Sequence, residues 1–281
     1  YKRQDDNSTI IYSISNFSKA IHSQLYDRRY KIKMQQSDSI ILDLDGTVYI
    51  DNQIINNSDA EIRRLAKEGK SIYYLTNNDS KNTDHYVSKL SKLNLPVNEN
   101  SIISPIHVMV DWIKKNNIEC VYILGVQELI NELEEKTGVV NSTKNPELII
   151  VAFDKELTYH KLETACELIN AGVPYYLSHI DIFCPTLKGN MPDCGAIGML
   201  IEKTTGKKSL NNFGKPSDLM TKYIDNKLDK NLNKIIVGDR IHTDIELGKK
   251  IGAETVLVCT GEYQNVKKDN LKININISLV S

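Results

Sequence analysis

Short apolar runs alternate along the chain with longer segments in which apolar residues recur every three or four positions. The short runs indicate buried β-strands, and the periodic segments indicate helices with one apolar face. The predicted strands span residues 39–43, 71–75, 120–124, 147–152, 174–177, 234–237 and 255–259. The predicted helices span residues 58–68, 82–93, 105–116, 127–137, 159–170, 194–204, 217–227 and 243–251. Because strands alternate with helices of about ten residues or more, the predicted fold class is α/β with parallel sheets.

The N-terminal segment, residues 1–37, departs from this pattern because it contains few strand formers. Ile14, Phe17, Ile21 and Leu25 recur at three- and four-residue spacing, which predicts one amphipathic helix. We expect this helical extension to pack on the body of the protein as an appendage.

Composition and net charge indicate which kinds of binding partner the protein does not favour. With 41% hydrophobic and 25% charged residues among 281, the chain has the composition of a soluble globular protein. Its 35 Lys and Arg balance 36 Asp and Glu to a net charge of −1, so electrostatics do not favour binding to nucleic acid or to an anionic membrane surface. The apolar runs are far shorter than the roughly 18 residues that a transmembrane helix needs. We therefore expect a soluble protein with no nucleic-acid and no membrane partner.

The five cysteines are scattered and include no C-x-x-C pair. This pattern predicts neither a disulfide framework nor a zinc site, and it favours a reducing, cytoplasmic compartment. Residue 1 is tyrosine, so a targeting segment upstream of it would not be visible in this sequence.

The sharpest local feature is the sequence DLDGT at residues 43–47, directly after an apolar run. In an extended chain alternate side chains share a face, so Asp43 and Asp45 are predicted to point into one crevice at the C-terminal end of a strand. Two neighbouring carboxylates suit a hard divalent cation and a division of roles between nucleophile and acid. A calcium loop is excluded because its sixth and twelfth positions, Val48 and Ile54, are not glycine and an acidic residue. A solvated turn is the alternative for this motif in isolation.

Two further motifs offer groups that bind phosphate. Thr76 and Asn77 follow a predicted strand and supply a hydroxyl, an amide and N–H groups, although an ordinary helix N-cap has the same composition. Lys215 lies in the sequence GKPS, residues 214–217. This lysine is either a phosphate-neutralising ammonium or a surface residue, and the motif is not a Walker A loop.

The last motif is GDRIHTD, residues 238–244, after the predicted strand 234–237. It places Asp239 at the C-terminal end of that strand. Asp244 is either a further carboxylate of the same site or only a first-turn helix acid favoured by the helix dipole.

Together and in this order, the four motifs resemble those of the haloacid dehalogenase superfamily, in the wording of its NagD-like or 4-nitrophenylphosphatase-like branch. The resemblance runs from about Ile40 to Tyr263 and includes the closing CTGE at residues 259–262. The family's usual Pro-Gly is Pro-Asp at residues 192–193, and the cap segment that commonly reads Ala-Thr-Asn-x-Asp is LSHID at residues 177–181. These departures leave the substrate open.

The spacing of the motifs locates an inserted domain. From Thr76 to Lys215 the chain advances 139 residues, which is too long for one crossover, and this interval has its own alternation of strands and helices. The resemblance implies a Rossmann-like parallel-sheet core at residues 38–119 and 209–281, with a large α/β cap inserted at residues 120–208.

The resemblance also implies a Mg²⁺-dependent phosphatase that hydrolyses a small phosphate monoester through an aspartyl-phosphate intermediate. Asp43 would attack phosphorus, and Asp45 would protonate the leaving oxygen and then deprotonate the water. Thr76 and the Asn77 backbone would hold the phosphoryl oxygens, and Lys215 would neutralise charge on the nucleophile and the phosphate.

The metal ligands that the resemblance implies are the Asp43 carboxylate, the Asp45 main-chain carbonyl and Asp239. Asp244 would support the cation through water.

In the cap, His179 and Asp181 follow the predicted strand 174–177, at an edge where the ligand-contacting loops of α/β sheets gather. Their donors and acceptor suit the hydroxyls of a small phosphorylated metabolite, so both are predicted to bind substrate. The alternative is that Asp181 only orders its own loop and that His179 lies in solvent. A homodimer through the cap is a further partner expectation that stays open.

Proteins of other functions share some of these residues. The motifs do not exclude a phosphomutase or phosphotransferase on the same scaffold, because partition of the acyl phosphate between water and an alcohol depends on details of the cap. A receiver-like signalling domain also uses a phospho-accepting Asp, Mg²⁺, Thr and Lys, but it has about 120 residues and no inserted domain. The intact acids argue against a catalytically inactive binding protein.

Overall fold

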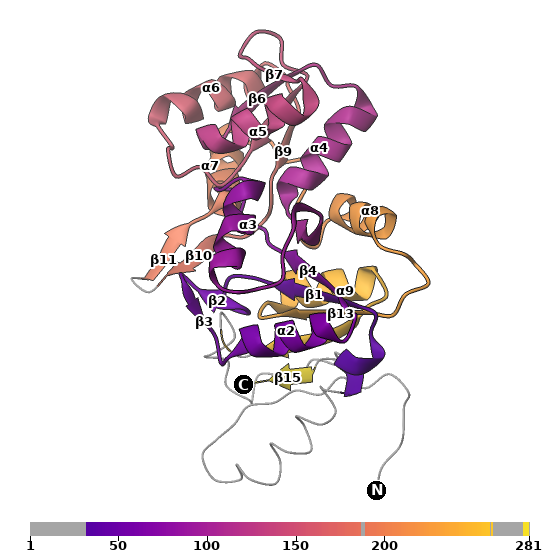
Figure 1. Ribbon diagram of the computed structural model, residues 1–281. Coiled ribbons are helices and arrows are strands. Elements are labelled where there is room, and N and C mark those ends of the chain that lie inside the picture. The colour runs from indigo at the N-terminus through magenta and orange to yellow at the C-terminus, as the bar shows by residue number, and fades with distance from the viewer. Residues whose placement is uncertain (1–31, 187–188, 259, 261–277, 281) are drawn as a thin grey trace, which may run out of the picture. The chain divides into compact units, whose positions relative to one another are not determined.

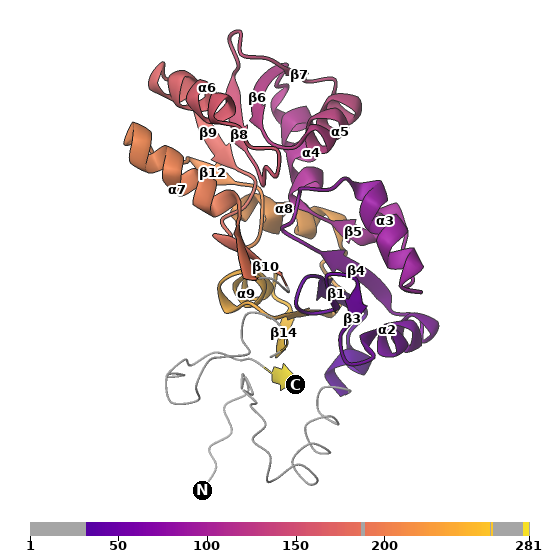
Figure 2. The same cartoon turned by 90° about the vertical axis from the view of Figure 1, so that its left-hand side faces the viewer.

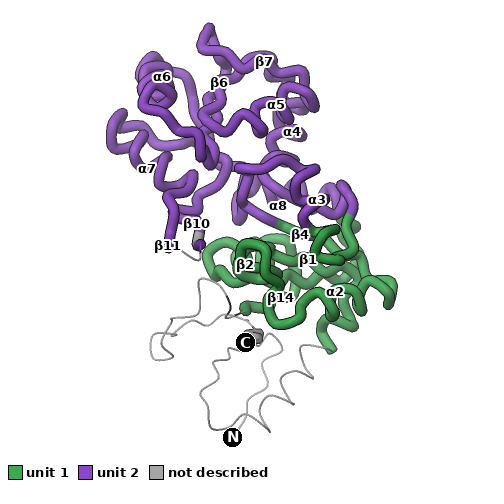
Figure 3. The backbone as a smooth tube through the Cα atoms, turned by 60° about the vertical axis from the view of Figure 1, so that its left-hand side comes forward, with its two compact units in different colours: residues 1–75, 90–97, 228–281 green, residues 76–89, 98–227 purple. Residues whose placement is uncertain are grey.

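The structure is a computed structural model that describes residues 32–186, 189–258, 260 and 278–280 (Figures 1 and 2). The chain divides into two compact units, shown in different colours in Figure 3. Unit 1 comprises residues 1–75, 90–97 and 228–281, and unit 2 comprises residues 76–89 and 98–227. The predicted N-terminal amphipathic helix lies outside the described residues. The domain boundaries expected from the resemblance stay a prediction.

The parallel sheet of unit 1 runs in the order β15-β14-β13-β1-β4. Its strands are β1 (Ser39–Asp43), β4 (Ser71–Leu75), β13 (Lys234–Gly238), β14 (Glu254–Val258) and β15 (Ser278–Val280). The other elements of the unit are β2 (Tyr49–Ile50), β3 (Gln53–Ile54), α2 (Ser58–Lys67), the π-helical turn η2 (Ile241–Ile245) and α9 (Glu246–Lys250). Helix α2 contacts β4, and α9 contacts β14.

The two central strands of unit 1 bring the sequence motifs to one edge. β1 and β13 are buried along their whole length, as expected for parallel strands that are covered on both faces. Leu42 pairs with Val237, so the residues that follow them, Asp43 on one strand and Gly238 and Asp239 on the other, lie at the same carboxyl edge. This is the edge at which α/β sheets gather their functional groups.

Unit 2 contains a second parallel sheet, in the order β12-β9-β8-β6-β7. Its strands are β6 (Cys120–Leu124), β7 (Val140–Asn141), β8 (Leu148–Val151), β9 (Tyr175–Leu177) and β12 (Asn211–Asn212). Its helices are α4 (Pro105–Asn116), α5 (Gln127–Thr137), α6 (Tyr159–Asn170), α7 (Cys194–Thr205) and α8 (Asp218–Lys227), together with most of α3 (Thr83–Lys92) and a short turn, η1 (Glu99–Ser101). The unit also contains β5 (Ile102–Ile103) and an antiparallel hairpin of β10 (Phe183–Thr186) and β11 (Gly189–Pro192).

Helices cover both faces of the unit 2 sheet. Figure 2 shows α6 and α7 on one face, and α4 and α5 on the other. Alternate residues of the central strands point to the α6 and α7 face and form one buried cluster with those helices. The cluster includes Tyr122, Leu124, Ile149, Val151, Ala165, Ile169, Ile197 and Ile201. The predicted parallel α/β class is therefore confirmed.

Several predicted helix ends are confirmed with their chemical cause. α4 begins with a proline, whose missing N–H is not needed in the first turn. α8 begins after Ser217, whose Oγ accepts a hydrogen bond from the backbone N–H of Met220 at 3.1 Å. α5 and α7 end at Gly138 and Gly206, which adopt left-handed φ values of 76° and 70°.

One predicted helix starts differently. Instead of a single helix over residues 243–251, the structure has η2 followed by the short α9. The carbonyl of Arg240 accepts hydrogen bonds from the N–H groups of both Asp244 (3.0 Å) and Ile245 (3.3 Å), which widens the first turn. Within the described residues, every helix is too short or too polar to span a bilayer.

Candidate active site

Three carboxylates lie together at the carboxyl edge of the unit 1 sheet. Asp43 ends β1, Asp239 follows β13, and Asp244 lies in η2. One carboxylate oxygen from each residue lies within 4.8 Å of the other two. The three residues are 6%, 1% and 0% exposed, respectively. The structure thus brings together the three carboxylates that were predicted at the metal site. Asp45, for which the main-chain carbonyl is the predicted ligand, is half-buried two residues after Asp43.

Asp244 is held in place by backbone on two sides. Its Oδ2 accepts a hydrogen bond from the Arg240 N–H at 3.1 Å. A Cβ atom at residue 238 would lie 2.3 Å from the Asp244 Cγ, so only glycine leaves room for this carboxylate. Asp244 is therefore a fixed, buried carboxylate and not only a first-turn acid facing water.

The chemistry of these donors fits a hard divalent cation. Three carboxylates at this distance repel one another, and burial removes the water that would screen them. A cation that prefers oxygen ligands, as Mg²⁺ and Ca²⁺ do, would offset that repulsion. The group contains no thiolate or imidazole, the ligands that are typical of zinc sites.

The turn after Asp43 is fixed by backbone contacts within unit 1. Gly46 has a left-handed φ of 98°, and its N–H donates to the Tyr49 carbonyl at 2.9 Å. The Gly46 carbonyl accepts from the Thr260 hydroxyl at 2.6 Å. Of the closing CTGE segment, Thr260 alone lies among the described residues, and this contact joins it to the first motif. The alternative of a solvated turn does not describe this segment, since most of its residues are buried.

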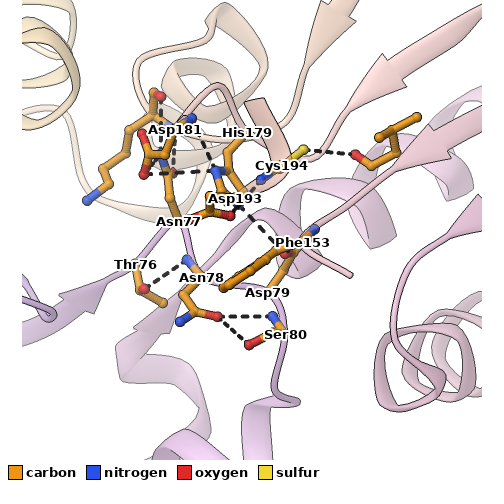
Figure 4. Close-up of polar contacts among 12 residues, drawn as sticks. Thr76, Asn77, Asn78, Asp79, Ser80, Phe153, His179, Asp181, Asp193 and Cys194 are labelled. Atoms are coloured by element: carbon orange, nitrogen blue, oxygen red, sulfur yellow. Dashed lines mark hydrogen bonds and ion pairs between the residues drawn. The ribbon is translucent and has the colours of Figure 1, made fainter. Parts of the chain in front are cut away.

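In unit 2, Thr76 and Asn77 begin a series of tight polar turns. The Thr76 Oγ1 accepts from the Asn78 N–H at 3.0 Å, and Asn78 in turn accepts from Ser80 (Figure 4). Helix α3 begins several residues later, where Asn82 accepts from the His85 N–H at 2.8 Å. Capping of α3 is therefore the role of Asn82, and the alternative of Thr76 and Asn77 as an N-cap is wrong.

Asn77 and Lys215 are joined through the backbone of Lys215. The Lys215 N–H donates to Asn77 Oδ1 at 2.8 Å, and Asn77 Nδ2 donates to the Lys215 carbonyl at 3.4 Å. Asn77 Nδ2 also donates to Asp181 Oδ2 at 3.3 Å. Because Lys215 is only 3% exposed, the alternative of a surface lysine is wrong.

His179 lies at the centre of a group of buried acids (Figure 4). Its Nε2 is 3.3 Å from Asp193 Oδ1 and 3.8 Å from Asp79 Oδ1, and its Nδ1 is 3.8 Å from Asp181 Oδ2. The residue is completely buried, so the alternative that places His179 in solvent is wrong. Substrate binding by His179 and Asp181 stays a prediction.

Sequence reasoning missed Asp79 and Asp193 as members of this group. Burial raises the pKa of Asp193 to about 6, and it also raises the pKa of Asp79. Asp193 is the N-cap of α7, where it accepts from the Cys194 N–H at 2.7 Å. The sequence signal that could have indicated Asp193 is the Pro-Asp at residues 192–193, where haloacid dehalogenases of the resembled branch commonly have Pro-Gly.

Comparison with known proteins agrees with the motifs. A family model for haloacid dehalogenase-like hydrolases matches residues 40–138, and a HAD-hydrolase-like model matches residues 212–278. The crystal structure of a 4-nitrophenylphosphatase from Thermotoga maritima is 31% identical, with a TM-score of 0.80, over 89% of this chain and 95% of that one. The chain belongs to the haloacid dehalogenase-like hydrolases.

Two curated relatives of this haloacid dehalogenase-like hydrolase have named activities. The 5'-nucleotidase YutF of Bacillus subtilis is 27% identical over 230 residues, which cover 81% of this chain and 89% of that protein. The acid sugar phosphatase of Staphylococcus aureus is 29% identical over 231 residues, which cover 81% and 88%. The resemblance to the 4-nitrophenylphosphatase-like branch is confirmed.

Proposed function

We propose that this haloacid dehalogenase-like hydrolase cleaves a small phosphate monoester, with Mg²⁺, through an aspartyl-phosphate intermediate on Asp43. Its broader class, a phosphoric monoester hydrolase, rests on relatives named as nucleotidase, sugar phosphatase and 4-nitrophenylphosphatase. The observation that carries the finer proposal is the buried group of Asp43, Asp239 and Asp244 at one sheet edge.

In the proposed reaction the Asp43 carboxylate attacks phosphorus in line and the ester P–O bond breaks. Asp45 gives its proton to the leaving oxygen, so the alcohol departs neutral. The resulting acyl phosphate on Asp43 is then attacked by water, whose proton returns to Asp45. Inorganic phosphate leaves, and both carboxyl groups regain their starting forms.

Asp43, Asp239 and the Asp45 main-chain carbonyl would hold Mg²⁺, with Asp244 supporting it through water. When bound, the cation would lower the repulsion between the anionic nucleophile and the phosphate.

The phosphate groups of the substrate need further positive and hydrogen-bonding partners. Thr76 and the Asn77 N–H would hold the phosphoryl oxygens, and the Lys215 ammonium would neutralise charge as it develops. All three residues are buried, which strengthens their electrostatic effect relative to a solvated site.

The proposed substrate class rests on the names of the relatives, each of which names a small phosphate ester as the substrate. A small phosphorylated metabolite is therefore the proposed substrate, and His179 and Asp181 in the cap are the proposed specificity residues. Cytoplasmic localisation and a homodimer through the cap stay predictions.

Hydrolysis of a panel of phosphate esters tests this function. The panel contains sugar phosphates, pyridoxal phosphate, phosphoglycolate, nucleoside monophosphates and 4-nitrophenyl phosphate, each with Mg²⁺ and with excess chelator. We expect phosphate release from at least one ester that requires Mg²⁺. Hydrolysis of none of them, or full activity in chelator, would contradict the proposal.

A further inference from the structure

The backbone of Lys215 is held by one side chain. Asn77 Oδ1 accepts from the Lys215 N–H at 2.8 Å while its Nδ2 faces the Lys215 carbonyl at 3.4 Å. An amide group thus matches both polar groups of one residue, as a neighbouring strand would. The direction in which the Lys215 side chain leaves the backbone therefore depends on the orientation of the Asn77 carboxamide.

Asp181 determines that orientation. Its Oδ2 accepts from Asn77 Nδ2 at 3.3 Å, and both residues are buried. If the carboxamide turned over, its oxygen would face the carboxylate and its nitrogen would face the Lys215 N–H, so both contacts would become repulsive. A carboxylate at residue 181 therefore allows only one orientation of Asn77.

The neighbouring glycine shows how closely these segments pack. A Cβ atom at Gly214 would lie 2.4 Å from the His179 Cβ and 2.8 Å from Asn77 Oδ1. Side chains essentially never approach so closely, so the segment before Lys215 lies directly on His179 and Asn77.

His179 fixes the segment that carries Asp181. Its ring is completely buried between Asp193, Asp79 and Asp181, and its Nδ1 accepts from the Asp181 N–H at 3.3 Å. Figure 4 shows Asn77, Asp181, His179 and Asp193 side by side. A buried group held from several sides has few alternative rotamers, so the Asp181 carboxylate is presented to Asn77 in one position.

We propose that Asp181 is a positioning residue: it holds the Asn77 carboxamide in the orientation that fixes the Lys215 backbone, and so it places the Lys215 ammonium for catalysis. The inference rests on the proposed function, in which Lys215 neutralises phosphate charge. It assigns to Asp181 an effect on every substrate, including esters that have no hydroxyl groups.

Double-mutant cycles test the inference. The reporter is kcat/KM for 4-nitrophenyl phosphate at saturating Mg²⁺, because this ester offers no hydroxyl for the cap to bind. We expect Asp181→Ala to lower kcat/KM by about tenfold or more, the scale of a lost charge-assisted contact. Asp181→Asn keeps an oxygen acceptor for Asn77 but can also present a donor, so its loss in kcat/KM should be smaller than that of Asp181→Ala.

The cycle with Lys215→Met separates positioning from folding. Once the ammonium is absent there is nothing left to place, so Asp181→Ala should cost less than about twofold in that background. Asp154→Ala is the matched control, because Asp154 is also a buried carboxylate of unit 2 but its Oδ2 pairs with the Lys161 ammonium at 2.8 Å. Its cost in kcat/KM should be the same with and without the Lys215 ammonium.

A swap of the two side chains gives a second readout if the alanine variant does not fold. Asn77→Asp sets two carboxylates against each other and should lose activity, whereas Asn77→Asp with Asp181→Asn restores one donor and one acceptor and should recover at least about tenfold. Failure of the double variant to recover activity would overturn the inference.

The remaining outcomes distinguish the inference from the proposed function. Equal costs of Asp181→Ala with and without the Lys215 ammonium would overturn the positioning role. A loss confined to hydroxyl-bearing esters would overturn it as well, and would make Asp181 a substrate-binding residue. Wild-type activity in Lys215→Met would overturn both the inference and the role of Lys215 in the proposed function.

Discussion

Replacing Gly238 with alanine should perturb the proposed metal site by displacing Asp244, the carboxylate that supports the metal ligands. The added Cβ atom would lie 2.3 Å from both Cγ and Oδ2 of Asp244. Gly238 pairs with Leu257 of β14, so the strand resists moving away. Since ordinary carbon contacts lie at about 3.5–4.0 Å, Asp244 must shift by roughly 1 Å or more. That shift breaks the 3.1 Å hydrogen bond from the Arg240 N–H to its carboxylate.

The magnitude follows from two separate effects. Forcing a methyl group into a packed site costs about 1–3 kcal/mol of folding free energy. Displacing a group that supports a metal ligand lowers metal affinity by about 10–100-fold. We therefore expect the half-saturating Mg²⁺ concentration to rise by about 10–100-fold, with a smaller fall in kcat at saturating Mg²⁺.

The assay is the initial rate of 4-nitrophenyl phosphate hydrolysis against Mg²⁺ concentration at constant ionic strength. Gly248→Ala is the matched control in the same unit: the atoms nearest to its Cβ would be Thr255 Cγ2 at 2.4 Å and Ile236 Cγ2 at 2.5 Å, and neither belongs to an acid. This control should lower the Tm yet leave the half-saturating Mg²⁺ concentration within about twofold. Equal shifts in the two variants would refute the supporting role of Gly238.

Two further predictions concern the metal and the pH dependence of stability. Asp239→Ala is expected to raise the half-saturating Mg²⁺ concentration more than Asp244→Ala, because Asp239 would bind the ion directly, and Ca²⁺ is expected to inhibit because it relaxes octahedral geometry; the reverse order, or activation by Ca²⁺, would contradict this. Burial lowers the pKa of His107 from 6.5 to about 4, so between these pH values the imidazole is protonated in the unfolded chain and neutral in the folded protein. The contribution of neutral His107 to the free energy of unfolding should therefore be complete above pH 6.5 and should be lost, by up to about 3 kcal/mol, as the pH falls to 4. In denaturant titrations, the free energy of unfolding of His107→Gln should decline less steeply over this pH range.

The positions of Asp43, Asp239 and Lys215 could be predicted from the sequence because each follows a strongly apolar run or precedes a helix. Strand ends in a parallel sheet share an edge, so local patterns were enough to place Asp43 and Asp239 together. The helices of ten or more residues were found within about two positions, because their apolar periodicity is sustained over several turns.

The group around His179 could not be predicted in the same way. Asp79 and Asp193 are 114 residues apart in the chain, and neither is part of a periodic pattern. Tertiary packing buries this imidazole among carboxylates, and local sequence patterns do not predict such contacts. The hairpins β2–β3 and β10–β11 were missed because two- to four-residue strands have too few positions to show alternation.

The local sequence pattern also did not predict the π-helical turn that begins at Ile241. In its wide first turn the N–H groups of Asp244 and Ile245 both donate to the Arg240 carbonyl, and such turns are frequent at functional sites. The correct first residue of this helix therefore follows from the site and not from helix propensity.

Trapping the covalent intermediate on Asp43 tests the proposed mechanism most directly. Asp45→Asn removes the base that activates water, while 4-nitrophenolate leaves without needing an acid, so the acyl phosphate should accumulate. The variant is mixed with 4-nitrophenyl phosphate that carries a radiolabelled phosphate, quenched in acid and divided into two samples. Peptides of the first sample are examined for label, and the second sample is reduced with borohydride, which releases the phosphate, before peptide mass spectrometry. The covalent mechanism predicts label in the peptide that carries residue 43 before reduction, and homoserine at that position without label after reduction. Both signals should be absent when Asp43→Asn is added. Phosphate release without label on the chain, or label on another residue, would contradict it.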